Sequence, residues 1–174
     1  MITVIKLILL SGLMGICLYT DLKEKKIYNK ETITGMGLGL LFNTIFSATP
    51  HVDSGFWLSL TGIVLGLLLF FIPFSLGGMG AGDLKLLGMV GAFLGWPAIG
   101  WVGLYSAIFG GVISLFIIMG DQAARKSTRT MLTNFAISFL HALKIESGSI
   151  PASGQRFAYS IAIALGVVLT LFLK

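Results

Sequence analysis

The chain has 174 residues, of which 56% are hydrophobic and only 11% are charged. Soluble globular domains carry roughly 25% charged residues, so this composition excludes a soluble enzyme and indicates an integral membrane protein. The net charge of +5 comes from basic residues in short segments between apolar runs, where they set membrane orientation rather than bind nucleic acid. We therefore expect one all-α domain over residues 1–174, with the lipid bilayer as partner.

A helix needs roughly 20 apolar residues to cross a bilayer, and six runs approach or reach this length. The runs are 2–20, 32–48, 56–74, 84–95, 98–119 and 157–173. A signal peptide is the rival interpretation of the first run. The strongest basic cluster follows that run, however, and no A-x-A cleavage site is clear, which favours a retained helix.

The break between the fourth and fifth runs is the sequence GWP at 95–97, because proline favours a helix start and disfavours a helix interior. The fourth run is short, so we expect its helix to begin within the glycine-rich segment before it. Residues 131–143, MLTNFAISFLHAL, alternate apolar and polar faces at helical spacing, which predicts an amphipathic helix lying in the membrane interface. A buried seventh element is the alternative.

The basic residues predict the orientation of the six spans. Segments 21–31, 75–85 and 120–156 hold ten of the twelve Lys and Arg residues. The positive-inside rule places such segments in the cytoplasm. An even number of spans puts both termini on one side, so both termini are expected outside a cytoplasmic (inner) membrane.

Two of the seven acidic residues stand apart. Glu24 lies among lysines, and we expect it to pair with them at the surface. The others lie in predicted loops, where we expect solvated roles: Glu31, Asp53, Asp121 and Glu146. Asp21 ends the first run and Asp83 precedes the fourth. The chain crosses the membrane twice between them, so both carboxylates reach the cytoplasmic boundary. Charged groups at such places are candidates for function when they face the protein interior.

Two carboxylates that approach each other share one proton. One can then draw a proton from water while the other protonates a peptide carbonyl. Gly80, Ala81 and Gly82 precede Asp83, and the glycines would leave room for a substrate backbone and permit unusual dihedral angles. Both aspartates lie at helix ends, and we expect that they can separate when no substrate is bound.

Simpler interpretations remain open for both aspartates. Asp83 is a candidate N-cap of the fourth helix, since aspartate favours that position, and Asp21 is a candidate for charge balance with nearby lysines. No metal or cofactor is expected, because Cys17 is the single cysteine, and His51 and His141 are isolated in the sequence.

The segments YTDLKEKKIYN (19–29) and GMGAGDLKLLG (78–88) resemble the two signatures of type IV prepilin peptidases, which are G-x-G-D membrane aspartyl proteases. GAFLGW at 91–96 and RFAYSIAIALG at 156–166 also resemble that family. The resemblance implies Asp21 and Asp83 as the catalytic pair. It implies Lys23, Asn29 and Lys85 as supporting positions.

The same resemblance implies that the protein removes a short basic leader from prepilins or pseudopilins at the cytoplasmic face. Many members carry paired cysteines linked to N-methylation of the product. This chain has only Cys17, so we expect cleavage without methyl transfer. Tyr28 stands where members often have proline, which puts the shape of that loop in question.

Three alternatives are kept. An archaeal preflagellin peptidase would use the same chemistry. A small proton-coupled transporter would use the two aspartates as proton carriers, although transporter sites lie near the bilayer midplane. A non-catalytic assembly protein would carry the two motifs by coincidence.

Overall fold

The structure is a computed structural model that describes residues 2–46, 55–75, 79–120 and 159–173. Each regular element within these ranges is an α-helix. The helices are α1 (Ile2–Glu24), α2 (Asn29–Phe46), α3 (Gly55–Ser75), α4 (Ala81–Leu94), α5 (Trp96–Gly120) and α7 (Ser160–Phe172). All six predicted runs are therefore confirmed as helices. The predicted interfacial helix at 131–143 lies outside the described residues.

Two helix boundaries follow the local sequence signals. α4 begins at Ala81, within the glycine-rich segment, as predicted. Gly95 separates α4 from α5 with a φ of 80°, a conformation that glycine adopts without steric cost. The predicted break at GWP is therefore confirmed.

α1 continues past its predicted end at residue 20 and stops at Glu24. Lys25 has a φ of 52°, and its N–H donates to the carbonyl of Asp21 at 2.9 Å. A single residue in the left-handed conformation commonly ends a right-handed helix in this way. Asp21 therefore lies inside the last turn of a helix rather than in the loop that follows it. That position makes its side-chain direction depend on helix packing.

The length and apolar composition of the helices show that this is a membrane protein. α1, α3 and the Trp96–Phe116 part of α5 are long and apolar enough to cross a membrane. α4 and α7 have 14 and 13 residues, and α2 has a polar first turn with Asn29, Lys30 and Glu31. Within the described part of the chain, length and composition thus support three crossings, and the six-span count stays a prediction.

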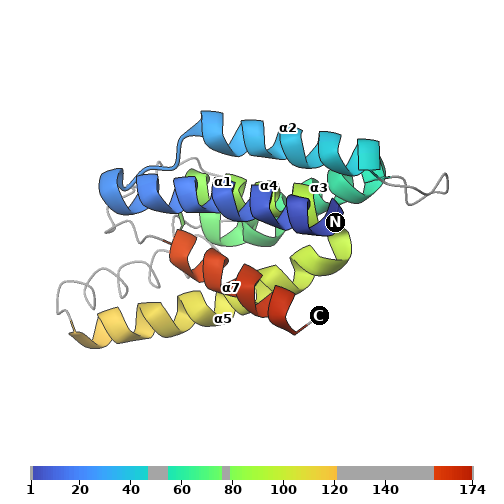
Figure 1. Cartoon of the computed structure of the whole chain (residues 1–174). Helices are drawn as coiled ribbons and strands as arrows, with labels where there is room; N and C mark the ends of the chain where they lie inside the picture. Colours follow the sequence, from blue (N-terminus) through green and yellow to red (C-terminus); the bar gives the residue numbers. More distant parts are fainter. Residues whose placement is uncertain (1, 47–54, 76–78, 121–158, 174) are drawn as a thin grey trace, which may run out of the picture.

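Successive helices run in opposite directions along the bundle (Figure 1). The start of α1 and the end of α7 lie at one end of the molecule. The last turn of α1, the start of α2 and the start of α7 lie at the other. Ends that are far apart in sequence therefore meet in space.

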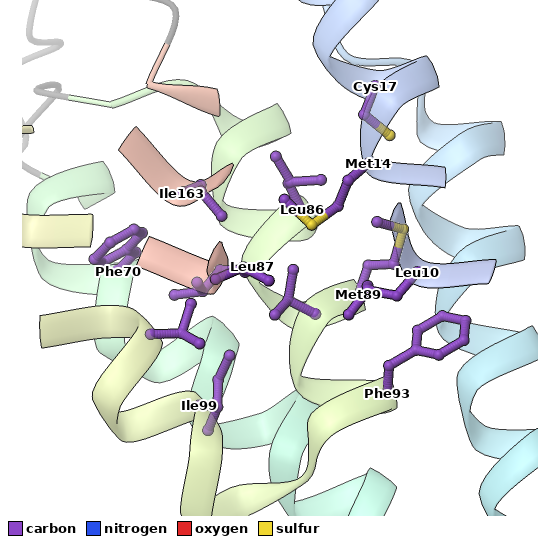
Figure 2. Packing of buried hydrophobic residues seen from close by; sticks show 13 residues of the cluster. Leu10, Met14, Cys17, Phe70, Leu86, Leu87, Met89, Phe93, Ile99 and Ile163 are labelled. Atoms are coloured by element: carbon purple, nitrogen blue, oxygen red, sulfur yellow. The ribbon is translucent and has the colours of Figure 1, made fainter. Parts of the chain in front are cut away.

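α4 occupies the centre of the fold, where it contacts α1, α2, α3, α5 and α7. Every residue from 86 to 93 is buried. A helix that is apolar on all sides belongs in an interior, which explains how a short helix can hold the core. Figure 2 shows side chains of α4 meeting those of α1, α5 and α7, among them Leu86, Leu87, Met89, Phe93, Leu10, Met14, Ile99 and Ile163.

Glycines bring α3 and α4 unusually close. A Cβ added to Gly62 or to Gly91 would collide with the backbone of the other residue, and one added to Gly66 would lie 2.7 Å from the Leu87 carbonyl oxygen. Gly62 and Gly66 are four residues apart on one helix face, which is the small-xxx-small pattern of close helix packing in membranes. This contact fixes α4 sideways against α3.

The C-terminal end of α4 is held by buried polar side chains. The Asn43 amide donates to the Ala92 carbonyl at 2.9 Å and to Ser59 Oγ at 2.7 Å. The Ser59 hydroxyl also donates to the Ala92 carbonyl, at 2.7 Å. The last carbonyls of a helix lack partners within the helix, so α2 and α3 satisfy a group that would otherwise be buried without one.

Candidate active site

Asp21 and Asp83 are both buried at the same end of the bundle. Asp21, in the last turn of α1, is 8% exposed, and Asp83, in the first turn of α4, is 5% exposed. α1 and α4 contact each other, and the two carboxylates lie within electrostatic range. The structure therefore brings together the two residues that the sequence singled out.

Asp21 has a partner on the last helix of the chain. The Ser160 hydroxyl donates a hydrogen bond to Asp21 Oδ2. Ser160 is fully buried and is the first residue of α7. The alternative that Asp21 balances nearby lysines at the surface is wrong, because its side chain is buried and bonded to Ser160.

Asp83 has one oxygen with a partner and one without. Its carboxylate accepts a hydrogen bond from the backbone of Gly80, whereas Oδ1 is buried with no hydrogen-bond partner among the described residues. Gly80, not Asp83, is the N-cap of α4, so the N-cap interpretation of Asp83 is wrong. A carboxylate three residues after the cap can reach back to the cap N–H, and that arrangement leaves Oδ1 for another group.

The glycines before Asp83 differ from each other. Gly80 is extended, with φ −76° and ψ 147°. Among the described glycines, positive φ occurs at Gly95 and not at Gly80 or Gly82. The unusual dihedral angles expected at Gly80 and Gly82 are therefore absent. A Cβ on Gly82 would lie 2.8 Å from Ile27 Cβ, so Ile27 fills the space beside Gly82, whereas Gly80 faces the Asp83 carboxylate.

Two of the three implied supporting residues contact each other. Lys85 Nζ donates to Asn29 Oδ1 at 2.7 Å, and this bond ties the first turn of α4 to the first residue of α2. Lys23 points elsewhere, with Nζ 5.6 Å from the centre of the Tyr19 ring on the exposed side of α1. The structure does not bring Lys23 to the two carboxylates.

Two acidic residues have partners that sequence reasoning missed. Glu31 was expected to be solvated in a loop, but it is half-buried in the first turn of α2 and accepts a hydrogen bond from Thr20 Oγ1 at 3.2 Å. Glu24 was expected to pair with lysines, but it accepts from the Tyr28 hydroxyl. That bond raises the pKa of Tyr28, which is exposed in the α1–α2 connection.

Sequence reasoning also missed the residues at the start of α7. Tyr159 lies within electrostatic range of Asp83, and Ser160 bonds Asp21. The sequence signal was weak, because the segment 156–166 resembles the family as a whole without pointing to either residue. Their importance follows from packing that joins residues 139 positions apart.

An apolar groove lies away from the two carboxylates. Within the described ranges, no cluster of three or more His, Cys, Asp and Glu side chains could hold a metal ion. An open apolar groove of about 650 Å³ lies between α3 and α5 and is lined by residues such as Phe70, Trp96 and Trp101. Its lining has no acid or base, so the buried carboxylates are the candidate site.

Comparisons with known proteins found one family model and two curated relatives that match this chain. The model of the type IV leader peptidase family matches residues 8–115, which is more than half of the chain. Two sequences described as "Prepilin leader peptidase/N-methyltransferase", from Aeromonas salmonicida strain A449 and from Aeromonas salmonicida, are each 31% identical over 114 residues.

That match covers 64% of this chain but only 39% of each relative's length. No solved structure matches the chain. The matched region of the family model includes both buried carboxylates, the Asn29–Lys85 bond and most of the helical core. This chain belongs to the type IV leader peptidase family.

Proposed function

We propose that this protein is an aspartyl leader peptidase that removes the basic leader from prepilins or pseudopilins. The observation that carries the proposal is the pair of buried carboxylates, Asp21 and Asp83, at one end of the bundle, with an oxygen on Asp83 that has no partner among the described residues. Buried polar groups are nearly always satisfied, so a buried oxygen without a partner calls for a ligand or a reacting group. The relatives are described as prepilin leader peptidases, which supports prepilins as the substrate class.

The proposed chemistry uses one proton shared by the pair. The ionised carboxylate takes a proton from a water molecule as the water oxygen attacks the scissile carbonyl carbon. The protonated carboxylate gives its proton to the carbonyl oxygen, which forms a neutral tetrahedral intermediate. Collapse of that intermediate breaks the C–N bond, and the proton held by the first carboxylate passes to the leaving amine. A hydroxyl proton of the intermediate returns to the second carboxylate, which leaves a carboxylic acid product and restores the shared proton.

The substrate backbone is proposed to lie along Gly80 and Ala81. Ala81 is exposed, and the nearest neighbour of a Cβ on Gly80 is Asp83 Oδ2 at 3.3 Å. A peptide that also used Gly82 would have to displace Ile27, whose side chain fills that space. A backbone that lies along Gly80 and Ala81 alone needs no such displacement.

Asn29 and Lys85 are proposed to support Asp83 through their hydrogen bond. Lys85 follows Asp83 by two residues on α4, so a fixed Lys85 limits how far the first turn of α4 can move. This bond lies at the exposed edge of the site, where it can open when substrate enters.

The site is proposed to face the cytoplasm across an inner membrane, with both termini outside. The support is the positive-inside rule applied to the basic segments beside Asp21 and Asp83, together with termini at the opposite end of the bundle (Figure 1). A preflagellin peptidase would share this arrangement. A proton-coupled transporter is less favoured, because its carboxylates belong near the midplane and these lie at helix ends.

The test is cleavage of a purified prepilin by the purified protein in detergent, followed by mass spectrometry of the products. We expect one cut that releases the basic leader, while a mock preparation from cells without the protein gives none. We propose cleavage alone, so the new N-terminus is expected without the mass of an added methyl group even when a methyl donor is supplied in the assay. Intact prepilin after incubation, together with proton flux in vesicles that carry the protein, would favour the transporter instead.

A further inference from the structure

The start of α7 carries a residue that contacts the proposed catalytic pair without facing the substrate loop. Ser160 is fully buried, and its hydroxyl donates to Asp21 Oδ2. We propose that Ser160 is a positioning residue that holds the Asp21 carboxylate in the orientation needed for hydrolysis. The inference rests on the proposed peptidase function.

The surrounding packing holds Ser160 in place. The Tyr159 ring meets Phe70 of α3 edge-on, with centroids 5.5 Å apart. The Tyr159 hydroxyl donates to the Ser106 carbonyl of α5 at 3.2 Å. A side chain on Gly110 would occupy the place of the Tyr159 ring, so that glycine makes the contact between α5 and Tyr159 sterically feasible.

The hydrogen bond makes the two carboxylates chemically unequal. A carboxylate that accepts from a hydroxyl is stabilised in its ionised form, and such charge-assisted bonds are the stronger ones. Asp21 accepts from the Ser160 hydroxyl on Oδ2. Asp83 accepts a backbone hydrogen bond from Gly80, but its Oδ1 is buried without a donor among the described residues. Asp21 is thereby fixed as the carboxylate that takes the proton from water, and Asp83 as the one that carries the shared proton.

The Ser160 bond also restricts rotation. An Asp side chain at a helix end can turn about its last bond, and a misplaced catalytic group costs rate even when it is still present. With Oδ2 engaged by Ser160, the other oxygen of Asp21 is the one left for water. Ser160 itself is predicted to touch neither water nor peptide, so its effect is expected in turnover and not in substrate binding.

The test compares Ser160→Ala, Ser160→Cys and Ser160→Thr with Ser106→Ala as the matched control. Ser106 is also fully buried, but its hydroxyl makes no hydrogen bond within the described part of the chain. Cysteine keeps the size of serine and is a poor donor, whereas threonine keeps the hydroxyl. The readouts are kcat, KM for a prepilin, and the melting temperature in detergent.

We expect Ser160→Ala and Ser160→Cys to lower kcat about tenfold or more, because a hydrogen bond to a charged group is lost. KM stays unchanged, Ser160→Thr restores most of kcat, and Ser106→Ala matches the wild type. The inference is overturned if Ser160→Ala and Ser160→Cys turn over like Ser106→Ala, or if they change KM alone. If kcat falls in all three Ser160 variants in proportion to the drop in melting temperature, Ser160 has a packing role, and this result also overturns the inference.

The same assay separates this inference from the function on which it rests. Wild-type protein that cuts no prepilin, or an Asp83→Asn variant that still cuts, contradicts the peptidase proposal, and the Ser160 inference falls with it. Cleavage that depends on Asp83 but is indifferent to the Ser160 hydroxyl contradicts the Ser160 inference alone.

Discussion

At the scale of single residues, the two buried carboxylates of the candidate site have few hydrogen-bond partners. Asp21 accepts from Ser160, and Asp83 accepts from Gly80 while its Oδ1 has no partner among the described residues. A buried acceptor without a partner costs roughly 1–3 kcal/mol. The fold keeps that group buried because the central helix, α4, places it there, and a substrate or water would supply the missing donor.

The first prediction concerns Gly82, whose missing side chain makes room for Ile27. Gly82→Ala places a Cβ 2.8 Å from Ile27 Cβ, and overpacking of this kind costs roughly 1–3 kcal/mol. We expect a lower melting temperature in detergent than for the wild type. Gly37→Ala is the matched control, because its added Cβ meets nothing within 4 Å and helical alanine is better than glycine. Equal melting temperatures for the two variants would contradict the close approach.

At the scale of elements, α4 is short but is held at both ends. Asn43 and Ser59 satisfy the Ala92 carbonyl at its C-terminal end, and Asn29 accepts from Lys85 near its start. The close approach to Gly62 fixes one side. A helix restrained in this way can present Asp83 in a defined place, which catalysis requires of its groups.

The second prediction concerns the bond between Asn29 and Lys85. Lys85→Met and Asn29→Ala each remove it, and we expect kcat/KM to fall about fivefold in each, for roughly 1 kcal/mol of a partly exposed hydrogen bond. The double variant is expected to fall no further, since the two residues act through one contact. Lys26→Met, on the exposed α1–α2 connection, is the control and keeps wild-type activity. Additive losses in the double variant would show that the two side chains act separately.

The elements themselves were largely predictable from the sequence. Apolar runs of the right length gave all six described helices, and GWP marked the break that Gly95 makes. The exact ends were less predictable, because α1 continues to Glu24 and α2 begins at Asn29. Those extensions are polar turns, which a search for apolar runs leaves out of the predicted helices. They nevertheless carry Asp21, Asn29 and Glu31.

At the scale of the whole molecule, the crossing pattern of the helices places the two carboxylates together. Because successive helices reverse direction (Figure 1), the end of α1 and the start of α4 share one end of the bundle. Counting crossings along the sequence predicted this proximity. It could not predict Ser160, because its contact with Asp21 depends on how α7 packs back against α1, 139 residues away in the chain.

Side-chain packing explains the other misses. The glycines at 80 and 82 look equivalent in the sequence, but Ile27 fills the space beside Gly82 alone. Glu31 looks solvated in the sequence, but the last turn of α1 brings Thr20 to it. Each depends on which face of one helix meets another, and residue types alone do not determine that.

The third prediction concerns orientation. If both termini lie outside, alkaline phosphatase fused after residue 174 will be active, and the same reporter fused in the α1–α2 connection after residue 26 will be inactive. The reason is that this reporter folds only outside, while the connection belongs to a lysine-rich segment that the positive-inside rule holds in the cytoplasm. The reverse pattern would place the carboxylates at the outer face and contradict the proposed location.

The most direct measurement of the central claim is prepilin cleavage by Asp21→Asn and Asp83→Asn, compared with the wild type and with Glu24→Gln. Glu24 is an exposed carboxylate three residues after Asp21, so its variant controls for loss of one negative charge at the same end of α1. Each Asn variant keeps the shape of the side chain, and melting temperature in detergent verifies that it folds. The account predicts cleavage by wild type and Glu24→Gln and no detectable cleavage by either Asn variant. Retained cleavage by Asp21→Asn or by Asp83→Asn would contradict the claim that these two buried carboxylates hydrolyse the peptide together.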